Sequence, residues 1–318
     1  MKEKQKHNKY LFIPNLRFLQ QFVLFVVIII LFFVMMRSFI WNSIRQYNSN
    51  VHLDSNPKTV IVNVEIPPEL PSYEKEQTVK EIPKIVIQTW KSKTTIPDFL
   101  KKSRESIQTW MPDFQYLFFD DTDIETFMSQ HYPHFLSKFH SFPFSIQRID
   151  FFRYCAIHFY GGIYLDGDVI VDGPMSDLLS LCLHAKKTIV FPVEYNLSID
   201  YGICQLFIKD GRRPDFASCQ KAPFGLGQFA FASSPKHPFW IYLMNRIPQY
   251  LPHPTQSPPP LFGEKYYVEV YTSTGPDQVS LACHDYFTKE ENELLLLTHQ
   301  QPFRFGDFAQ HIMVGSWK

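Results

Sequence analysis

The sequence predicts an α/β domain with a mainly parallel sheet over residues 82–318. Short runs rich in β-branched and aromatic residues alternate with segments of helical spacing, which is typical of strands joined by crossover helices. The chain has 318 residues, of which 45% are hydrophobic and 16% aromatic, so it can bury one large core or two small ones. This composition excludes a disordered or low-complexity protein.

The first two strand-helix units follow each other directly. "IPKIVIQTW" (residues 82–90) is a β-rich run, and residues 97–111 follow with helical spacing and a proline in the first turn. "FQYLFFD" is the next strand, after which Asp121 or Thr122 caps a helix that runs through about His131.

The third unit contains the longest helical pattern of the domain. "SIQRIDFFRYCAIHFYGG" places five apolar residues on one helical side: Ile146, Ile149, Phe152, Ala156 and Phe159. Gly161 and Gly162 end this helix before the strand "IYLD". Asp166 therefore lies at the carboxyl end of a strand, where open α/β sheets bind their ligands.

The second half of the domain is less regular. It contains a strand at residues 187–194 ("KTIVFPVE") and a helix at residues 237–247 ("HPFWIYLMNRI"). The proline-rich segment 251–263 ("LPHPTQSPPPLFG") is expected to be a long loop that either carries specificity or lies on the surface.

The N-terminal region is predicted to be a membrane anchor. Residues 18–36 are apolar except for Gln20 and Gln21, enough for roughly 28 Å of helix at about 1.5 Å per residue. More positive charges precede this run than follow it, which places residues 1–17 in the cytosol and the rest on the lumenal side. Residues 37–81 are polar and proline-containing, as expected for a stem. A cleaved signal peptide is the alternative interpretation.

Charge and cysteine content limit the partners and the chemistry. The 31 basic and 31 acidic residues balance, so nucleic acid is not an expected partner. The five cysteines have no metal-ligand spacing, and an odd number leaves at least one unpaired in an oxidising lumen. Cys155 lies in an apolar helical pattern and is the expected buried free thiol.

The "DGD" of Asp166, Gly167 and Asp168 predicts a metal site. Two carboxylates one residue apart repel each other unless a cation lies between them, and Mg²⁺ or Mn²⁺ would relieve that repulsion and hold phosphate oxygens. A solvated turn is the alternative, since this tripeptide is common in loops. An EF-hand calcium loop is excluded because its remaining ligands are absent.

An acid and a base share one face of the helix that precedes this motif. Asp150 and Arg153 lie about 60° apart on a helix, on the side away from Phe152 and Ala156. If the helix packs beside the strand that carries the aspartates, both groups reach the metal site. An ion pair of purely structural value is the alternative.

The ordered set of motifs resembles glycosyltransferase family 32. The motifs that carry this resemblance are "IPKIVIQTW", "WMPDFQYLFFDD", "IQRIDFFRY", "YGGIYLDGDV", "TSTGP" and "FAQHIMVGSW". They extend from about Ile82 to Trp317. The resemblance implies a GT-A fold, a nucleotide-sugar donor and Mn²⁺ or Mg²⁺ as cofactor. Between the two aspartates the family commonly has a bulky apolar residue, whereas this chain has Gly167.

The resemblance also implies roles for single residues. Asp166 and Asp168 match the metal-binding DXD motif, and His311 is a further candidate metal ligand. Asp150 and Arg153 match the pair that contacts the donor hexose. The expected roles are as follows: catalytic residues Asp150, Arg153 and Asp168; donor-binding residues Gln88, Trp90, Arg148, Asp150, Arg153 and Gly162; metal ligands Asp166, Asp168 and His311. Trp90 is expected against the nucleotide base, with a place in the core as the alternative.

The expected function is metal-dependent transfer of a hexose with retention of anomeric configuration, through same-face attack by the acceptor. Mannose from GDP-mannose is the expected donor, and a glycan or glycolipid hydroxyl is the acceptor. The alternatives are a UDP-sugar-dependent galactosyl- or N-acetylglucosaminyltransferase and a non-catalytic sugar-binding protein. Type II topology with a stem is typical of Golgi members of the family, so a Golgi or other secretory-pathway membrane is the expected location.

Overall fold

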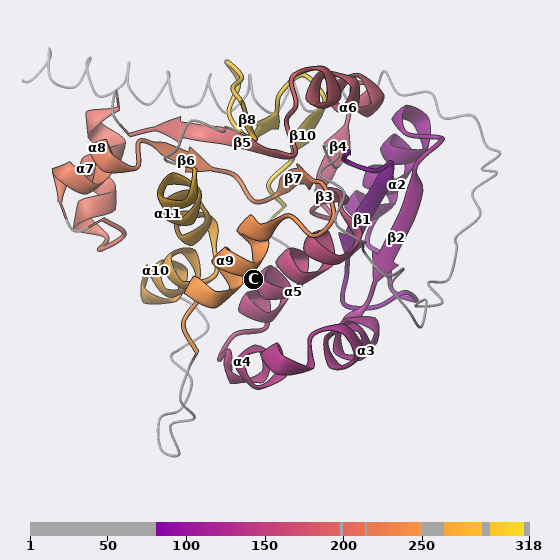
Figure 1. Cartoon of the computed structure of the whole chain (residues 1–318), viewed down its shortest axis with the longest axis horizontal. Coiled ribbons are helices and arrows are strands. Elements are labelled where there is room, and N and C mark those ends of the chain that lie inside the picture. The colour runs from indigo at the N-terminus through magenta and orange to yellow at the C-terminus, as the bar shows by residue number, and fades with distance from the viewer. Residues whose placement is uncertain (1–80, 198–199, 214, 250–263, 288–292, 315–318) are drawn as a thin grey trace, which may run out of the picture. The chain divides into compact units, whose positions relative to one another are not determined.

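The computed structural model describes residues 81–197, 200–213, 215–249, 264–287 and 293–314, with side chains left out at 264–268 (Figure 1). All of them belong to one compact unit, Thr59–Lys318. The predicted cytosolic tail, membrane anchor and nearly all of the stem lie outside the described residues, as does the loop 251–263. Within the described ranges, no helix has the length and hydropathy to cross a membrane.

A mixed sheet forms the centre of the domain. In the described residues it has seven strands in the order β2-β1-β3-β7-β5-β6, with β8 paired to β5. Their bounds are β1 (Ile85–Thr89), β2 (Gln115–Phe119), β3 (Gly162–Leu165), β5 (Ile189–Asn196), β6 (Phe224–Leu226), β7 (Ala230–Ser233) and β8 (Leu294–Leu297). Strands β6 and β7 run opposite to the others. The prediction of an α/β fold with a mainly parallel sheet is therefore confirmed.

A smaller sheet brings the C-terminal segment to the middle of the chain. It consists of β4 (Val169–Val171), β10 (Ala309–His311) and β9 (Arg304–Phe305), in that order. The antiparallel register of β10 on β4 places His311 opposite Val169. Because Val169 follows Asp168 directly, this pairing positions the C-terminal histidine beside the two aspartates.

Helices cover both faces of the large sheet (Figure 1). Their bounds are α2 (Asp98–Trp110), α3 (Asp121–His131), α4 (Leu136–Ser141), α5 (Ser145–Tyr160), α6 (Met175–His184), α7 (Tyr201–Lys209), α8 (Phe216–Lys221), α9 (Pro238–Arg246), α10 (Glu264–Ser273) and α11 (Pro276–Tyr286). In β1, Ile87 packs in one core with residues of α3, α5, α9 and α11, and Val86 packs in the other with residues of α2 and α6. The side chains of successive strand residues thus pack on opposite faces of the sheet.

Helix α5 is the central helix of the larger core. Residues 150–157 are all buried, so the apolar side predicted from periodicity is only part of its packing surface. Gly161 ends the helix with φ 67°, and Gly162 follows with φ 92°. A Cβ on Gly162 would overlap the carbonyl oxygen of Ile85 on the adjacent strand, so β1 and β3 can pair this closely only with glycine there.

Two local predictions need correction or completion. The N-cap of α3 is Asp120, whose carboxylate accepts hydrogen bonds from the backbone of Thr122 and Asp123, whereas Asp121 and Thr122 are inside the helix. Cys204 and Cys219 form a disulfide that joins α7 to α8, a pairing that spacing alone does not determine. Cys155 is buried and free, as predicted.

Candidate active site

The two aspartates and His311 form a cluster suited to a metal ion. One ligand atom from each of Asp166, Asp168 and His311 can be chosen so that all three lie within 4.8 Å of one another. Asp166 follows the last residue of β3, Asp168 precedes β4, and His311 ends β10. The cluster therefore depends on three strand ends that meet at one edge of the fold.

A tight turn sets the spacing of the two carboxylates. The amide of Val169 donates to the carbonyl of Asp166 at 3.0 Å, and the amide of Asp166 donates to the carbonyl of Phe229 at 2.7 Å. Gly167, between the aspartates, has no positive φ. A Cβ at that position would come closest to the end of the Leu100 side chain, at 3.2 Å, and would make ordinary contacts with Thr89 and Phe99 at 3.8 and 3.9 Å. The turn does not require a glycine.

His311 is held against Asp168 and against an aromatic ring. Its Nε2 lies 3.1 Å from Oδ1 of Asp168, and its ring stacks on Phe229 with centroids 4.7 Å apart. Burial alone would lower the pKa of His311, but the hydrogen bond and charge of Asp168 raise it above its usual value. Burial would raise the pKa of Asp168, but the same hydrogen bond and the amide of Val314 lower it. Their contact thus favours the charged forms of both groups.

The donor set fits a hard divalent cation. Carboxylate oxygens are preferred by Mg²⁺ and Mn²⁺, and an imidazole nitrogen also suits Mn²⁺. Burial raises the pKa of Asp166 although the charge of Arg153 lowers it, and the charge of Asp168 raises it further. The protein therefore carries a carboxyl group that resists ionisation beside a second carboxylate, and a cation would relieve this repulsion.

Asp150 and Arg153 meet on one face of α5, as predicted. Nη2 of Arg153 lies 3.2 Å from Oδ1 of Asp150, and the two residues are 3% and 1% exposed respectively. Nη1 of Arg153 lies 3.2 Å from Oδ1 of Asp166. The ion pair of the structural alternative therefore exists, and the same guanidinium also reaches the metal cluster.

Further polar groups fix this pair in place. Asp150 accepts hydrogen bonds from Thr274 Oγ1 at 2.8 Å and from Gln228 Nε2 at 3.0 Å. Arg153 donates to the carbonyl oxygen of Gln228 at 2.9 Å. The Tyr154 hydroxyl lies 2.6 Å from both Gln228 Oε1 and the carbonyl oxygen of Thr274. The Asp150 carboxylate and both Nη atoms of Arg153 have defined partners, which restricts these side chains to one arrangement, whereas Nε of Arg153 is buried without a partner among the described residues.

Burial controls the protonation of the pair. It raises the pKa of Asp150 to about 6, although Arg153, Thr274 and Gln228 act in the opposite direction. Burial would lower the pKa of Arg153, but the charges of Asp166, Tyr164 and Asp150 raise it well above its usual value. Arg153 is therefore a permanent cation between two carboxyl groups.

The other predicted donor-binding residues are spread more widely. Gln88 is buried and donates from Nε2 to Ser103 Oγ at 2.9 Å and to the carbonyl oxygen of Asp166 at 3.2 Å. It therefore holds the backbone of the turn that carries the two aspartates. Trp90 is partly exposed just after β1, and its indole nitrogen donates to the carbonyl of Thr95 at 3.0 Å. This places its ring outside the two main core clusters.

Arg148 and Gly162 are not brought to the cluster. Arg148, in the first turn of α5, lies near Asp121 instead. Burial raises the pKa of Asp121, and the charge of Arg148 offsets part of that rise. Gly162 begins β3, whereas Asp166 follows the other end of that strand, a separation of about 13 Å at about 3.3 Å per residue. The conformation of Gly162 is explained by the pairing of β3 with β1.

Comparison with known proteins finds a family similarity in this part of the chain. Residues 97–184, which include Asp150, Arg153, Asp166 and Asp168, match the family described as "Glycosyltransferase sugar-binding region containing DXD motif". Over residues 97–184 the chain is therefore similar to this glycosyltransferase family. This region extends from α2 to α6 and contributes two of the three residues of the metal cluster, and His311 lies beyond it.

Two fungal enzymes are among the proteins to which the chain is similar. The chain is 26% identical to inositol phosphoceramide mannosyltransferase 1 of Schizosaccharomyces pombe, over 75% of this chain and 63% of that protein. It is 26% identical to an initiation-specific alpha-1,6-mannosyltransferase of Candida albicans, over 53% of this chain and 43% of that protein. The chain thus spans less than two thirds of either relative. A solved structure, the PaToxG glycosyltransferase, aligns with TM-score 0.36 and 16% identity over 65% of this chain and 70% of that one, too distant for further argument.

The sequence interpretation missed Gln228. This residue holds Asp150, Arg153 and Tyr154 from outside the glycosyltransferase region, in the segment that joins β6 to β7. The two glycines of "FGLGQ", Gly225 and Gly227, were the available signal, because glycines within a strand mark close approach of another group.

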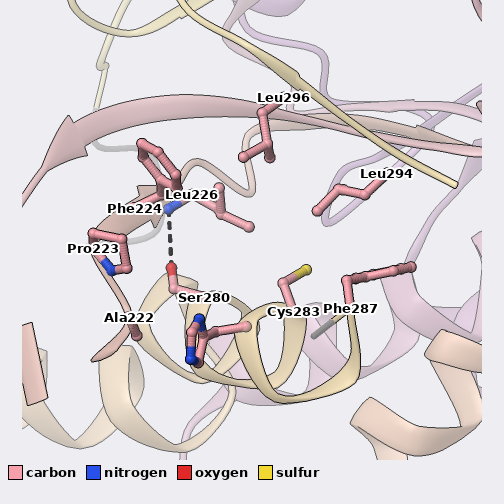
Figure 2. A pocket seen from close by; sticks show the side chains of 10 residues that line it. Ala222, Pro223, Phe224, Leu226, Ser280, Cys283, Phe287, Leu294 and Leu296 are labelled. Carbon is pink, nitrogen blue, oxygen red and sulfur yellow. Dashed lines mark hydrogen bonds between the residues drawn. The ribbon is translucent and has the colours of Figure 1, made fainter. Parts of the chain in front are cut away.

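The structure also has an apolar cavity that is separate from this site. It has a volume of about 190 Å³ and lies between α11, β6 and β8, where Ser280 Oγ accepts a hydrogen bond from the amide of Leu226 (Figure 2). Its walls include Phe224, Leu226, Cys283, Phe287, Leu294 and Leu296. Because the described residues that line it include no carboxylate to hold a hard cation and no lysine or arginine to pair with phosphate, it is not a candidate for binding a metal-diphosphate group.

Proposed function

We propose that the protein transfers a hexose from a nucleotide sugar to a hydroxyl group of a glycan or glycolipid. The observation that carries this proposal is the position of Arg153, which lies 3.2 Å from both Asp150 and Asp166. It joins a buried acid-base pair to a cluster of three potential metal ligands. Hexose recognition and diphosphate binding are thereby combined at one edge of the sheet.

The residues of the site have distinct tasks in this reaction. Asp166, Asp168 and His311 would hold a divalent cation, which when bound neutralises negative charge on the departing diphosphate. Asp150 and Arg153 would form hydrogen bonds to hydroxyl groups of the donor hexose. Their partners Gln228 and Thr274 lock both side chains, so little reorganisation is needed when the sugar binds.

Mannose from GDP-mannose is the proposed donor, and an inositol-containing glycolipid is the favoured acceptor. The names of the relatives support mannose as the sugar and an inositol-containing lipid as the acceptor, since one is an inositol phosphoceramide mannosyltransferase and the other an alpha-1,6-mannosyltransferase. We also propose a single N-terminal membrane anchor at residues 18–36 with the catalytic domain in the Golgi lumen. The support for this location is the apolar run and the charge distribution of the sequence.

A donor screen tests the proposal. The full chain in detergent is incubated with inositol phosphoceramide, with GDP- or UDP-sugars, and with Mn²⁺, Mg²⁺ or a chelator, and release of nucleoside diphosphate is followed. We expect release from GDP-mannose that requires a divalent cation, is lost in D168N and is unchanged in E105Q. Glu105 is exposed on α2 and provides a matched control for loss of one negative charge.

The other outcomes of this screen separate the alternatives. Release from a UDP-sugar alone would identify a galactosyl- or N-acetylglucosaminyltransferase. Binding of a nucleotide sugar with no release from any donor would identify a sugar-binding protein and would overturn the proposed activity. Release that continues undiminished in chelator would overturn the role of the metal.

A further inference from the structure

Glu194 is an acidic residue close enough to His311 of the site for the charge of His311 to lower its pKa. It lies outside the matched residues 97–184. It lies on β5, at the point where the register between β5 and β6 is interrupted between Val193 and Tyr195. Irregularities of this kind redirect a side chain and are frequent next to active sites. Glu194 is partly buried, so solvent or a ligand can still reach it.

The carboxylate of Glu194 packs against the segment that joins the two halves of the site. A Cβ on Gly227 would lie 2.9 Å from Oε1 of Glu194, so the absence of a side chain there leaves room for the carboxylate. The amide of Gly227 donates to the carbonyl oxygen of Pro192 at 2.9 Å, which fixes this segment to β5. The two residues that follow Gly227 are Gln228, which holds Asp150, and Phe229, which stacks on His311.

Glu194 differs from the other acidic groups of the site in its partners. Asp150, Asp166 and Asp168 each accept hydrogen bonds from named donors. Among the hydrogen bonds of the described residues, none reaches the carboxylate of Glu194, and it forms no ion pair there. Its carboxylate is therefore partly buried, carries no partner among the described residues and is free to contact a ligand.

Charged groups on several elements surround Glu194. Burial raises its pKa to about 7, the charges of His311 on β10 and Arg212 after α7 lower it, and Asp277 on α11 raises it. Tyr271 on α10 is also nearby. Burial is the main cause that raises the pKa of Tyr271, and the charge of Glu194 raises it further. Arg212 is not available to neutralise Glu194, because it forms a two-point ion pair with Asp277 at 2.7 and 2.9 Å.

We propose that Glu194 accepts the proton of the acceptor hydroxyl during transfer. This role rests on the proposed function. In this step, the acceptor oxygen forms a bond to the anomeric carbon of the hexose, and the bond from that carbon to the diphosphate breaks. The electron pair of the broken bond leaves with the diphosphate, and the hydroxyl proton moves to the Glu194 carboxylate and then to solvent.

The geometry favours Glu194 over the other carboxylates for this step. Asp166 and Asp168 belong to the metal cluster, and Asp150 is 1% exposed and bound by Thr274 and Gln228. Glu194 is partly exposed, unpaired and placed beside the same segment. A carboxylate with a pKa near neutrality also suits a group that takes up and releases a proton.

The test compares E194Q, E194D and the exposed control E105Q in the full chain. Rates of transfer from GDP-mannose are measured at saturating Mn²⁺ with two acceptors, inositol phosphoceramide and azide. Azide is an anion and needs no proton acceptor, whereas a hydroxyl does. We expect E194Q to lose at least about 100-fold in kcat with the hydroxyl acceptor. It should transfer to azide at the wild-type rate and bind GDP with Mn²⁺ as the wild type does, and E194D should keep part of the hydroxyl activity.

Each other outcome has a separate meaning. Hydroxyl transfer at the wild-type rate in E194Q, or equal loss with both acceptors, overturns the proton-acceptor role while the proposed function stands. Weaker Mn²⁺-dependent GDP binding in E194Q overturns it in favour of a metal ligand. Absence of transfer by both wild type and E105Q with every nucleotide sugar overturns the proposed function and this role with it.

Discussion

Arg153 lies 3.2 Å from Asp166 although the two residues are in different parts of the fold, one in the middle of α5 and the other directly after β3. The same guanidinium carbon lies 4.8 Å from the centroid of the Tyr164 ring, and the Tyr164 hydroxyl donates to Asp166 at 3.0 Å. This relationship couples the helix face to the metal cluster. A change on α5 is therefore expected to act on stability and on catalysis together.

Asp150→Ala is expected to destabilise the protein by about 3 kcal/mol or more, because it leaves Arg153, Thr274 and Gln228 buried without their acceptor. An exposed i,i+3 pair would contribute only about 0.5 kcal/mol. Asp150→Asn keeps one acceptor oxygen and removes a carboxyl whose pKa burial already raises to about 6, so it should cost less stability. Denaturant unfolding gives the free energies, and the rate of donor cleavage is expected to fall at least about 100-fold in both variants.

Arg246→Ala provides the surface comparison for this prediction. Arg246 pairs with Asp285 while 33% exposed, and the loss of such a pair is expected to cost about 0.5 kcal/mol. Equal losses for Asp150→Ala and Arg246→Ala would contradict the buried network. Wild-type transfer rates in Asp150→Asn would remove Asp150 from the catalytic site.

The contact between His311 and Asp168 makes the stability of the metal-free protein depend on pH. Because the pKa of His311 is raised on folding, its contact contributes stability that is complete below pH 6.5. This stability is lost as the pH rises through the pKa of His311 in the folded protein. Because the pKa of Asp168 is lowered on folding, its contact contributes stability that is present above pH 3.8. This stability is lost as the pH falls through the pKa of Asp168 in the folded protein. In chelator, His311→Gln is therefore expected to destabilise the protein by about 1 kcal/mol more at pH 5.5 than at pH 8.5.

His140→Gln serves as the reference for this measurement. His140 pairs with Glu125 at an exposed position, with side chains 51% and 53% exposed. Urea unfolding of both variants at the two pH values is the measurement, and the reference should change by less than about 0.5 kcal/mol between them. A larger cost of His311→Gln at pH 8.5 than at pH 5.5 would mean that His311 is neutral in the folded protein.

Gly167→Ala is expected to keep the activity within about threefold, because the turn has no positive φ at this position and the one close contact of the new methyl group is with the flexible end of Leu100. Gly162→Ala is expected to cost about 3 kcal/mol through overlap with the backbone of Ile85 and a φ of 92°. Thermal unfolding and transfer rates of both variants test this contrast. Loss of metal-dependent activity in Gly167→Ala would mean that the departure from the family pattern is functional.

The features that local sequence determines were predictable. The strand-helix alternation, the end of α5 at Gly161 and the common face of Asp150 and Arg153 follow from periodicity and backbone preference within about twenty residues. The resemblance of "FAQHIMVGSW" to a family motif identified His311. Its place in the cluster is set by the pairing of β10 with β4, which joins residues far apart in the chain.

The features that depend on tertiary contact were not predictable in this way. Gln228 reaches Asp150 because the segment between β6 and β7 passes over α5, and nothing in the residues around Gln228 encodes that path. In the sequence Glu194 is one polar position in an apolar strand, and the register irregularity beside it depends on the pairing of β5 with β6. The Cys204–Cys219 disulfide likewise depends on the packing of two short helices.

Mn²⁺-dependent binding of nucleoside diphosphate tests the central claim most directly, since the claim is that Asp166, Asp168 and His311 hold a cation for the donor. Isothermal titration of GDP and UDP into the wild type and D168N, with Mn²⁺ and in chelator, is the measurement. The wild type is predicted to bind the nucleotide of its donor only with Mn²⁺, and D168N to bind it at least about 100-fold more weakly. Equal affinity of wild type and D168N, or undiminished binding of the wild type in chelator, would contradict the account.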